Sequence, residues 1–255
     1  MQNRRLKRSN KANPREDRNT RGNPGNQGVR NNIVELDQFS KTFKSKVELV
    51  PKNLNQETYI DRLEDPSTNI VFAIGPAGTG KSYLATLYSI QALKTGAVKK
   101  VVITRPNVAL DDKDIGYLPG DIYGKMAPWT KPILEIFEDY YSPKTIAGML
   151  ENNIIELLPM AFIRGRTLKN SIILLDEAQN TTPNSMVSAL TRIGEGSKMI
   201  VTGDTRQSDR GTSNGLTDFL NRYRPNPRVA VVEFEQRDVE RHPVIATILN
   251  WYGEE

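Results

Sequence analysis

Short runs of apolar residues alternate with longer amphipathic stretches from about residue 32 onward. Compact aliphatic runs are typical of buried strands, whereas apolar residues spaced three or four positions apart are typical of helices. We expect strands at 70–74, 101–104, 154–158, 172–175, 199–202 and 229–234, and helices at 83–94, 132–141, 143–152, 183–193, 215–223 and 239–251. The alternation predicts an α/β domain in which helices cover both faces of a mainly parallel sheet.

The first 31 residues have a different character, because they are rich in Asn, Arg, Gly and Pro and contain almost no apolar side chains. They hold nine Lys or Arg against only Glu16 and Asp17, and so account for the net charge of +5. Such a segment buries too little apolar surface to offset its ordering entropy. We therefore expect a basic disordered tail at 1–31 and one folded domain at 32–255. The tail suits contact with phosphate backbones, and a solubilising role fits it equally well.

The absence of cysteine and of long apolar runs excludes several classes of protein. The chain has no cysteine and one histidine, so disulfides and Cys-based zinc sites are excluded. No apolar run approaches the roughly 20 residues that span a bilayer, and no apolar segment follows the basic N-terminus. We expect a cytoplasmic protein without a membrane partner.

A glycine-rich segment lies between the expected strand 70–74 and the expected helix 83–94. Its residues are Gly75, Pro76, Ala77, Gly78, Thr79, Gly80, Lys81 and Ser82. This is the context of a P-loop, where glycines let backbone N–H groups point inward and a helix N-terminus favours phosphate. We expect Lys81 to reach the β- and γ-phosphates of a nucleotide and Ser82 to offer its hydroxyl to Mg²⁺.

Two carboxylates, Asp176 and Glu177, follow the aliphatic strand expected at 172–175. Ligand sites of parallel sheets lie at the carboxyl ends of strands, so these acids are expected to face the phosphate loop. Asp176 is the expected Mg²⁺ ligand through the water shell of the metal, together with Ser82. Glu177 is the candidate for polarising the attacking water, which predicts ATP hydrolysis rather than binding alone.

A third polar segment, 203–209, follows the strand expected at 199–202. We expect Gln207 to hydrogen-bond the γ-phosphate or the attacking water. An ordinary polar turn is the alternative for this segment.

These motifs together resemble superfamily 1 helicases, and more closely the PhoH-like family of phosphate-starvation-inducible ATPases. The matching segments are 55–56, 103–106, 118–121, 125–129, 159–168, 175–180 and 239–243, and they span about residues 50 to 252. The resemblance implies a three-layer P-loop NTPase fold of RecA-like type that uses ATP and Mg²⁺. It also implies that Gln56 reads the adenine edge, and that Arg241, or else Arg237, contacts the γ-phosphate. A surface position is the alternative for each of these residues.

The resemblance further implies a function coupled to single-stranded nucleic acid, RNA more than DNA, as a helicase-like translocase or remodelling factor. The alternative is a nucleotide-dependent switch or assembly ATPase that acts on a protein partner. Only 48 residues, 208–255, follow Gln207, which are too few for a second RecA-like domain. We therefore expect a homo-oligomer, a hexameric ring, in which Arg241 acts on a neighbouring subunit.

Aromatic and basic residues occur together between residues 107 and 166, a combination that stacks bases and holds phosphates. They are Tyr117, Tyr123, Lys125, Trp129, Lys131, Phe162, Arg164 and Arg166. For each of them, packing in the core or a salt bridge at the surface is the alternative.

Overall fold

The computed structural model describes residues 46–106, 122–209, 211, 213–240, 244 and 251, without the side chains of 122–127. These residues belong to one compact unit, Ile33–Glu255. The tail expected at 1–31 lies outside the described residues, so its disorder and the domain boundary stay predictions.

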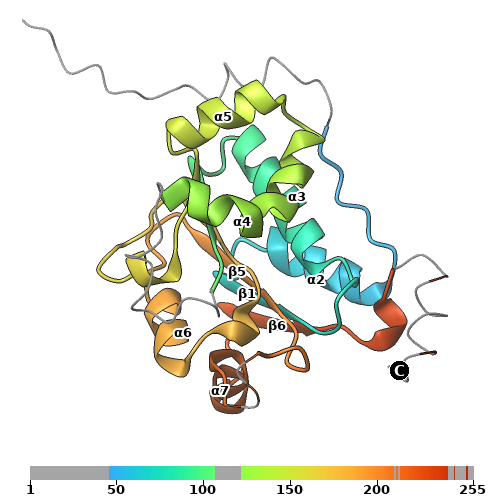
Figure 1. Cartoon of the computed structure of the whole chain (residues 1–255). Coiled ribbons are helices and arrows are strands. Elements are labelled where there is room, and N and C mark those ends of the chain that lie inside the picture. Colours follow the sequence, from blue (N-terminus) through green and yellow to red (C-terminus); the bar gives the residue numbers. More distant parts are fainter. Residues whose placement is uncertain are drawn as a thin grey trace, which may run out of the picture. The chain divides into compact units, whose positions relative to one another are not determined.

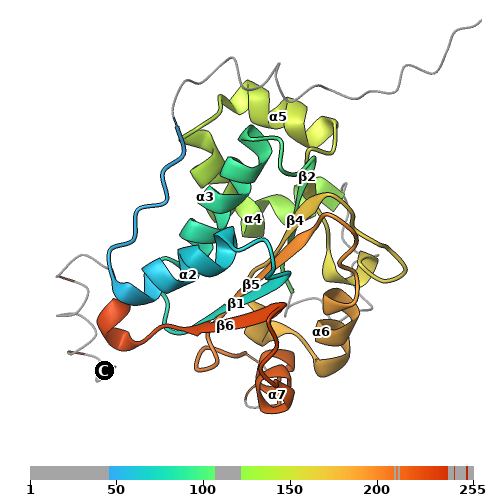
Figure 2. The same ribbon diagram turned by 180° about the vertical axis from the view of Figure 1, so that it is seen from behind.

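Six parallel strands form a single sheet in the described part of the chain (Figures 1 and 2). They are β1 (Ile70–Ile74), β2 (Lys100–Thr104), β3 (Ile155–Leu157), β4 (Ser171–Leu175), β5 (Lys198–Gly203) and β6 (Val229–Glu233). The spatial order is β3-β2-β4-β5-β1-β6, so β5 lies between β1 and β4. Each strand coincides with an aliphatic run of the sequence within two residues, which confirms the predicted α/β fold.

The helices are α2 (Leu54–Glu64), α3 (Lys81–Lys94), α4 (Ile122–Glu138), α5 (Pro143–Glu151), α6 (Pro183–Leu190) and α7 (Gly215–Arg222). Short 3₁₀ turns lie at η1 (Met160–Phe162), η2 (Ala178–Asn180) and η3 (Gln236–Asp238). The helices expected at 83–94, 143–152, 183–193 and 215–223 are confirmed.

Three expectations for helices need correction. Helix α2 was not predicted, because its buried face is short and its other positions are polar. Helix α4 begins ten residues before the expected start, since Pro132 lies inside the helix rather than in its first turn. Val239 and Glu240 are not helical, and most of the remainder of the helix expected at 239–251 lies outside the described residues.

The sheet has a different helical layer on each face (Figures 1 and 2). Val71 and Ala73 of β1 pack in a core that includes residues of α2, α3, α4 and α5. Phe72 and Ile74 point to the opposite core, which contains residues of α6 and α7. Phe72 stacks on Phe219 of α7 with ring centroids 4.0 Å apart. The fold is therefore three-layered, as a parallel sheet covered on both faces requires.

Buried Lys198 of β5 is hydrogen-bonded to the C-terminal end of α2. Its ammonium donates to the backbone oxygens of Arg62, Leu63 and Asp65 at the C-terminus of that helix. Burial lowers the pKa of Lys198 to about 8, so the side chain is still largely charged at pH 7. This contact fixes the helix that reaches the phosphate loop.

Sheet register brings three polar residues into one row. Ile103 of β2 pairs with Leu174 of β4, and Leu174 pairs with Ile200 of β5. Side chains alternate between the two faces of a sheet, so the residues two positions further on share the face of α2 and α3. Those residues are Arg105, Asp176 and Thr202.

Candidate functional site

The loop 75–80 connects β1 to α3 with several residues in left-handed backbone conformations. Gly75, Gly78 and Gly80 have φ angles of 145°, 88° and 83°. Lys81 and Ser82 are the first two residues of α3, so they lie at the end of the helix that attracts anions. The backbone has the wrapped course that the glycines predict.

Gly75 is enclosed by two other strands. Its N–H donates to Gly203 O at 3.1 Å, at the end of β5. A β-carbon at this position would lie 2.3 Å from the carbonyl oxygen of Phe234, directly after β6. A side chain is therefore excluded here for steric as well as conformational reasons.

The ammonium of Lys81 crosses the inside of the loop. It donates to the carbonyl oxygens of Gly75 at 2.8 Å and Pro76 at 2.6 Å, and to Thr79 Oγ1 at 3.1 Å. The side chain is buried. The positive charge is thus held where a bound phosphate would replace the carbonyl oxygens as its partner.

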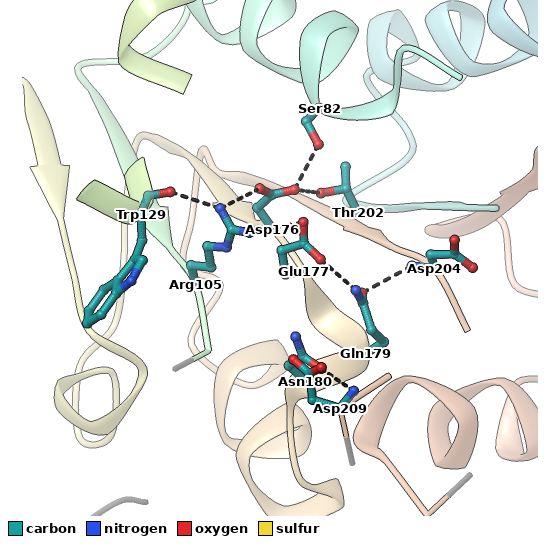
Figure 3. A network of polar contacts seen from close by, with 10 residues as sticks. All are labelled: Ser82, Arg105, Trp129, Asp176, Glu177, Gln179, Asn180, Thr202, Asp204 and Asp209. Atoms are coloured by element: carbon teal, nitrogen blue, oxygen red, sulfur yellow. Dashed lines mark hydrogen bonds and ion pairs between the residues drawn. The ribbon is translucent and has the colours of Figure 1, made fainter. Parts of the chain in front are cut away.

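Asp176 follows β4 and is the most constrained acid of the site (Figure 3). Its Oδ1 accepts hydrogen bonds from Ser82 Oγ at 2.8 Å and from Thr202 Oγ1 at 2.5 Å. Its backbone N–H donates to Thr104 O at 3.1 Å. The side chain is 7 % exposed, so these donors compensate the cost of burying its charge.

The donor set of Ser82 and Asp176 fits Mg²⁺. A hydroxyl and a carboxylate oxygen lie side by side at the end of the loop, and Mg²⁺ prefers oxygen ligands. In the described part of the chain, no group of three or more His, Cys, Asp or Glu residues could hold a metal.

Glu177 has an unusual backbone and two side-chain partners. Its φ of 55° is in the left-handed region, and the chain turns there into η2. Oε1 lies 3.0 Å from Arg105 Nη2, and Oε2 accepts a hydrogen bond from Gln179 Nε2 at 2.5 Å. Strain of this kind persists where the surroundings hold it, and is common at functional sites.

Gln179 connects the acidic pair to the segment after β5. Its Oε1 accepts from the backbone N–H of Asp204 at 3.1 Å (Figure 3). The N–H of Gln207 in turn donates to the backbone oxygen of Asp204 at 3.2 Å. The acids and the third polar segment therefore share one hydrogen-bond network.

A cavity of about 280 Å³ lies where these elements meet. Its described lining residues are Ala77, Gly78, Gly80, Lys81, Ser82, Tyr83, Asp176, Glu177, Gly203, Asp204 and Gln207. The structure thus brings together five of the eight predicted loop residues, both acids and Gln207.

Gln56 contacts the phosphate loop but is not among the described residues that line the cavity. The side chain is buried on α2, where Nε2 donates to Thr79 O at 3.1 Å and Oε1 accepts from Lys52 N at 2.8 Å. The amide therefore supports the loop in this structure. Its expected contact with adenine stays a prediction.

Of the two arginines expected to contact the γ-phosphate, Arg241 and Arg237, the structure describes only Arg237. Arg241 lies outside the described residues. Arg237 on η3 is exposed, and its Nε lies 3.0 Å from Glu235 Oε2. Immediately before Arg241, the N–H of Glu240 donates to Gly78 O at 2.8 Å, so the described chain reaches the phosphate loop at this point.

The aromatic and basic residues of 107–166 are described only in part. Arg166 binds Glu156 through both terminal nitrogens, at 2.5 and 3.1 Å, which supports the salt-bridge alternative for this residue. Phe162 and Arg164 are exposed. Tyr117 and the side chains of Tyr123 and Lys125 lie outside the described part.

Arg105, Thr202 and Gln179 were not predicted as site residues, although all three contact the acidic pair. Arg105 and Thr202 lie at the carboxyl ends of strands that flank β4. Their positions at the ends of expected strands could have indicated a role. Only the strand order shows that they lie beside the acids that follow β4.

The described fold and site define a P-loop nucleoside triphosphatase. A glycine-rich loop joins the first strand of a parallel sheet to a helix that begins with Lys81 and Ser82, and Asp176 lies at a parallel strand end. The family model for the PhoH-like protein matches residues 48–253. The chain belongs to the PhoH-like family, and with this fold it is an ATPase-like nucleotide-binding protein.

Individual proteins support this assignment. The PhoH-like protein of Bacillus subtilis (strain 168) is 39% identical over 221 residues, which cover 86% of this chain and 68% of that protein. Protein PhoH of Escherichia coli (strain K12) is 34% identical over 224 residues, which cover 86% of this chain and 62% of that protein. The chain thus spans about two thirds of the length of these relatives.

The solved structures include one with a similar fold, the large terminase of bacteriophage HK97. It aligns with a TM-score of 0.51 at 13% identity, and the match covers 88% of this chain and 52% of that chain. At this identity the likeness concerns the fold. Among the described residues, no helix is both long and apolar enough to cross a membrane.

The enclosure of Gly75 predicts a selective effect of alanine. Gly75→Ala should lower the free energy of unfolding by about 3 kcal/mol, because strain and a steric clash add. Gly96→Ala is the matched control, since Gly96 also has a positive φ but no atom lies within 4 Å of the place that its β-carbon would occupy. It should cost about 1 kcal/mol. Urea unfolding measures both, and equal losses would contradict the proposed clash.

Proposed function

We propose that this protein hydrolyses ATP with Mg²⁺ and couples hydrolysis to single-stranded nucleic acid, RNA more than DNA. The observation that carries the hydrolytic part is the position of Glu177 in the cavity. It follows Asp176 directly, and the cavity also exposes Lys81 and Ser82. A carboxylate beside a phosphate site that can hold a metal is suited to polarise water.

The residues of the loop bind and orient the triphosphate in this proposal. Backbone N–H groups from Gly78 to Ser82 surround the phosphates, and Lys81 leaves its carbonyl partners to neutralise the terminal phosphate. Ser82 and Asp176 would hold Mg²⁺, which when bound neutralises charge on the phosphate oxygens. Gln207, which also lines the cavity, orients the γ-phosphate or the attacking water.

Two substitutions separate binding from hydrolysis. Lys81→Ala should reduce ATP turnover by at least about 100-fold, because a charge that stabilises the transferred group is lost. Glu177→Gln should keep ATP bound and lower kcat by about 100-fold or more, because the amide cannot accept a proton. Steady-state turnover and equilibrium nucleotide binding measure the two effects.

Matched controls for these substitutions lie on α5, where Lys144 and Glu151 are exposed. Lys144→Ala and Glu151→Gln should behave as the parent. If Glu177→Gln turned over ATP as fast as the parent, the role of Glu177 in polarising water would be rejected.

Charge and exposed side chains support the nucleic-acid part of the proposal. The nine cations of residues 1–31 suit a phosphate backbone. Phe162 and Arg164 are exposed after β3 and offer a stacking surface beside a cation. The match to the PhoH-like family covers residues 48–253 and so includes Phe162 and Arg164.

Single-stranded oligouridylate should therefore raise the ATPase rate, more than oligothymidylate of equal length. The stimulation should fall steeply with salt, since each phosphate contact on a single strand contributes a slope of about −0.7 to the plot of log affinity against log salt. Replacing the nine tail cations by Gln in the full chain should flatten this slope and leave basal turnover unchanged. Lys81-dependent turnover that ignores both polymers would favour a protein-partner switch instead.

We also propose a homo-oligomer, a hexameric ring, in which Arg241 reaches the site of a neighbouring subunit. Of the described residues that line the cavity, Lys81 alone carries a positive charge, and the nearby Arg105 is paired with Glu177. Phosphoryl transfer gains from a second cation near the transferred group. Head-to-tail contacts that close into a ring would supply it repeatedly.

Mixing two inactive variants tests this arrangement. Lys81→Ala lacks a working loop and Arg241→Ala lacks the proposed finger, so each alone should be inactive. In rings mixed at random from equal amounts of the two variants, an intact loop meets an intact Arg241 at about a quarter of the interfaces, and activity should return to that extent. Light scattering with ATP gives the mass in parallel. A fully active monomer, or no recovery in a confirmed mixed ring, would exclude the finger in trans.

A further inference from the structure

Arg105 is the one described arginine that contacts the acidic pair (Figure 3). It follows β2 directly, and its side chain points to the same face of the sheet as Asp176. Nη2 lies 3.0 Å from Glu177 Oε1, and Nη1 lies 4.0 Å from Asp176 Oδ2. The side chain is 27% exposed, so water screens these contacts only in part.

A third partner of this guanidinium belongs to a different element. Nη1 donates to the backbone oxygen of Trp129, on α4, at 2.9 Å. The planar, rigid fork of an arginine can hold two partners at fixed positions, which the point charge of a lysine cannot do. Arg105 therefore connects α4 directly to Glu177.

Helix α4 is locally weakened at the point where Arg105 binds it. Pro128 and Pro132 both lie inside the helix. A proline has no N–H and crowds the carbonyl four residues earlier, so Pro132 leaves the carbonyl of Pro128 without its helical donor. The next carbonyl, that of Trp129, is the one that accepts from Arg105. Such a turn moves at lower cost than a regular helix.

Glu177 is restrained by these contacts. Arg105 and Gln179 each bind one of its two carboxylate oxygens. With both oxygens engaged by donors, the carboxylate is held in one orientation and has fewer lone pairs free to accept a proton of water. Release of the Arg105 contact would leave one oxygen available to accept that proton.

We propose that Arg105 is a positioning residue that restrains Glu177 while α4 holds it, and that binding of single-stranded nucleic acid releases the restraint by displacing the turn around Trp129. This proposal rests on the proposed function, in which Glu177 polarises water. The polymer would displace the turn around Trp129, so that the guanidinium follows α4 and leaves Glu177. ATP turnover would then rise only when the polymer is bound.

Kinetics of Arg105 variants test the proposal. Arg105→Met should raise basal kcat by about threefold to tenfold with little change in KM, and oligouridylate should no longer stimulate it. Arg105→Lys keeps the charge but cannot bridge two partners, so it should also lose the stimulation. Arg222→Met is the matched control, because Arg222 is exposed on α7 and pairs only within its helix. It should keep the basal rate and the stimulation of the parent.

A second measurement does not depend on turnover. Trp129 and Trp251 are the two tryptophans of the chain, so Trp251→Phe leaves Trp129 as the only indole reporter. In that background, a non-hydrolysable ATP analogue with Mg²⁺ should shift the Trp129 emission. Adding Arg105→Met should abolish the shift and leave the affinity for the analogue unchanged.

The outcomes separate the inference from the proposed function. Without Lys81-dependent turnover in the parent, the proposed function falls and the inference falls with it. If the parent is active but Arg105→Met lowers kcat, or keeps the full stimulation, only the inference is overturned. If no polymer stimulates the parent, the nucleic-acid part of the function fails, and the release by polymer with it. An emission shift that survives Arg105→Met likewise contradicts the connection.

Discussion

The arrangement of the site depends on the hydrogen bonds to the buried carboxylate of Asp176. A charge out of water must be compensated by donors, and here the donors come from Ser82 on α3 and Thr202 on β5. The backbone of the same residue binds Thr104 on β2. Because one residue joins three elements, the phosphate loop cannot move relative to the central strands without breaking these bonds. The other contacts of the site are arranged around Asp176.

Much of the fold was predictable because its strands are buried on both faces. Strands of this kind appear as continuous aliphatic runs, and all six runs became strands. The phosphate loop was equally clear, since glycines, Lys81 and Ser82 occur at fixed spacing between a strand and a helix. Helix α2 was missed because Tyr59, Ile60 and Leu63 give it only a narrow buried face. The start of α4 was wrong because Pro132 is normally expected in a first turn rather than in a helix interior.

The contacts of Arg105 and Gln56 were beyond the sequence for a different reason. Each depends on which distant segments become neighbours, and periodicity does not contain that information. Arg105 reaches Glu177 only because β2 pairs with β4. Gln56 binds Thr79 O only because α2 packs beside the loop. The family resemblance implied a contact between Gln56 and adenine, which stays a prediction, and the fold adds a supporting contact with the phosphate loop.

The insertion of β5 between β1 and β4 has a consequence for the size of the site. Neighbouring strands are about 4.8 Å apart, so the loop after β1 and the acids after β4 are separated by two such spacings, roughly 10 Å. Adjacent strands would leave half that width, too little for a phosphoryl group together with a metal ion and a water molecule. The strand order therefore acts as a spacer. Backbone pairing thus sets the separation of the two strand ends, and the hydrogen bond of Ser82 to Asp176 bridges it from the start of α3.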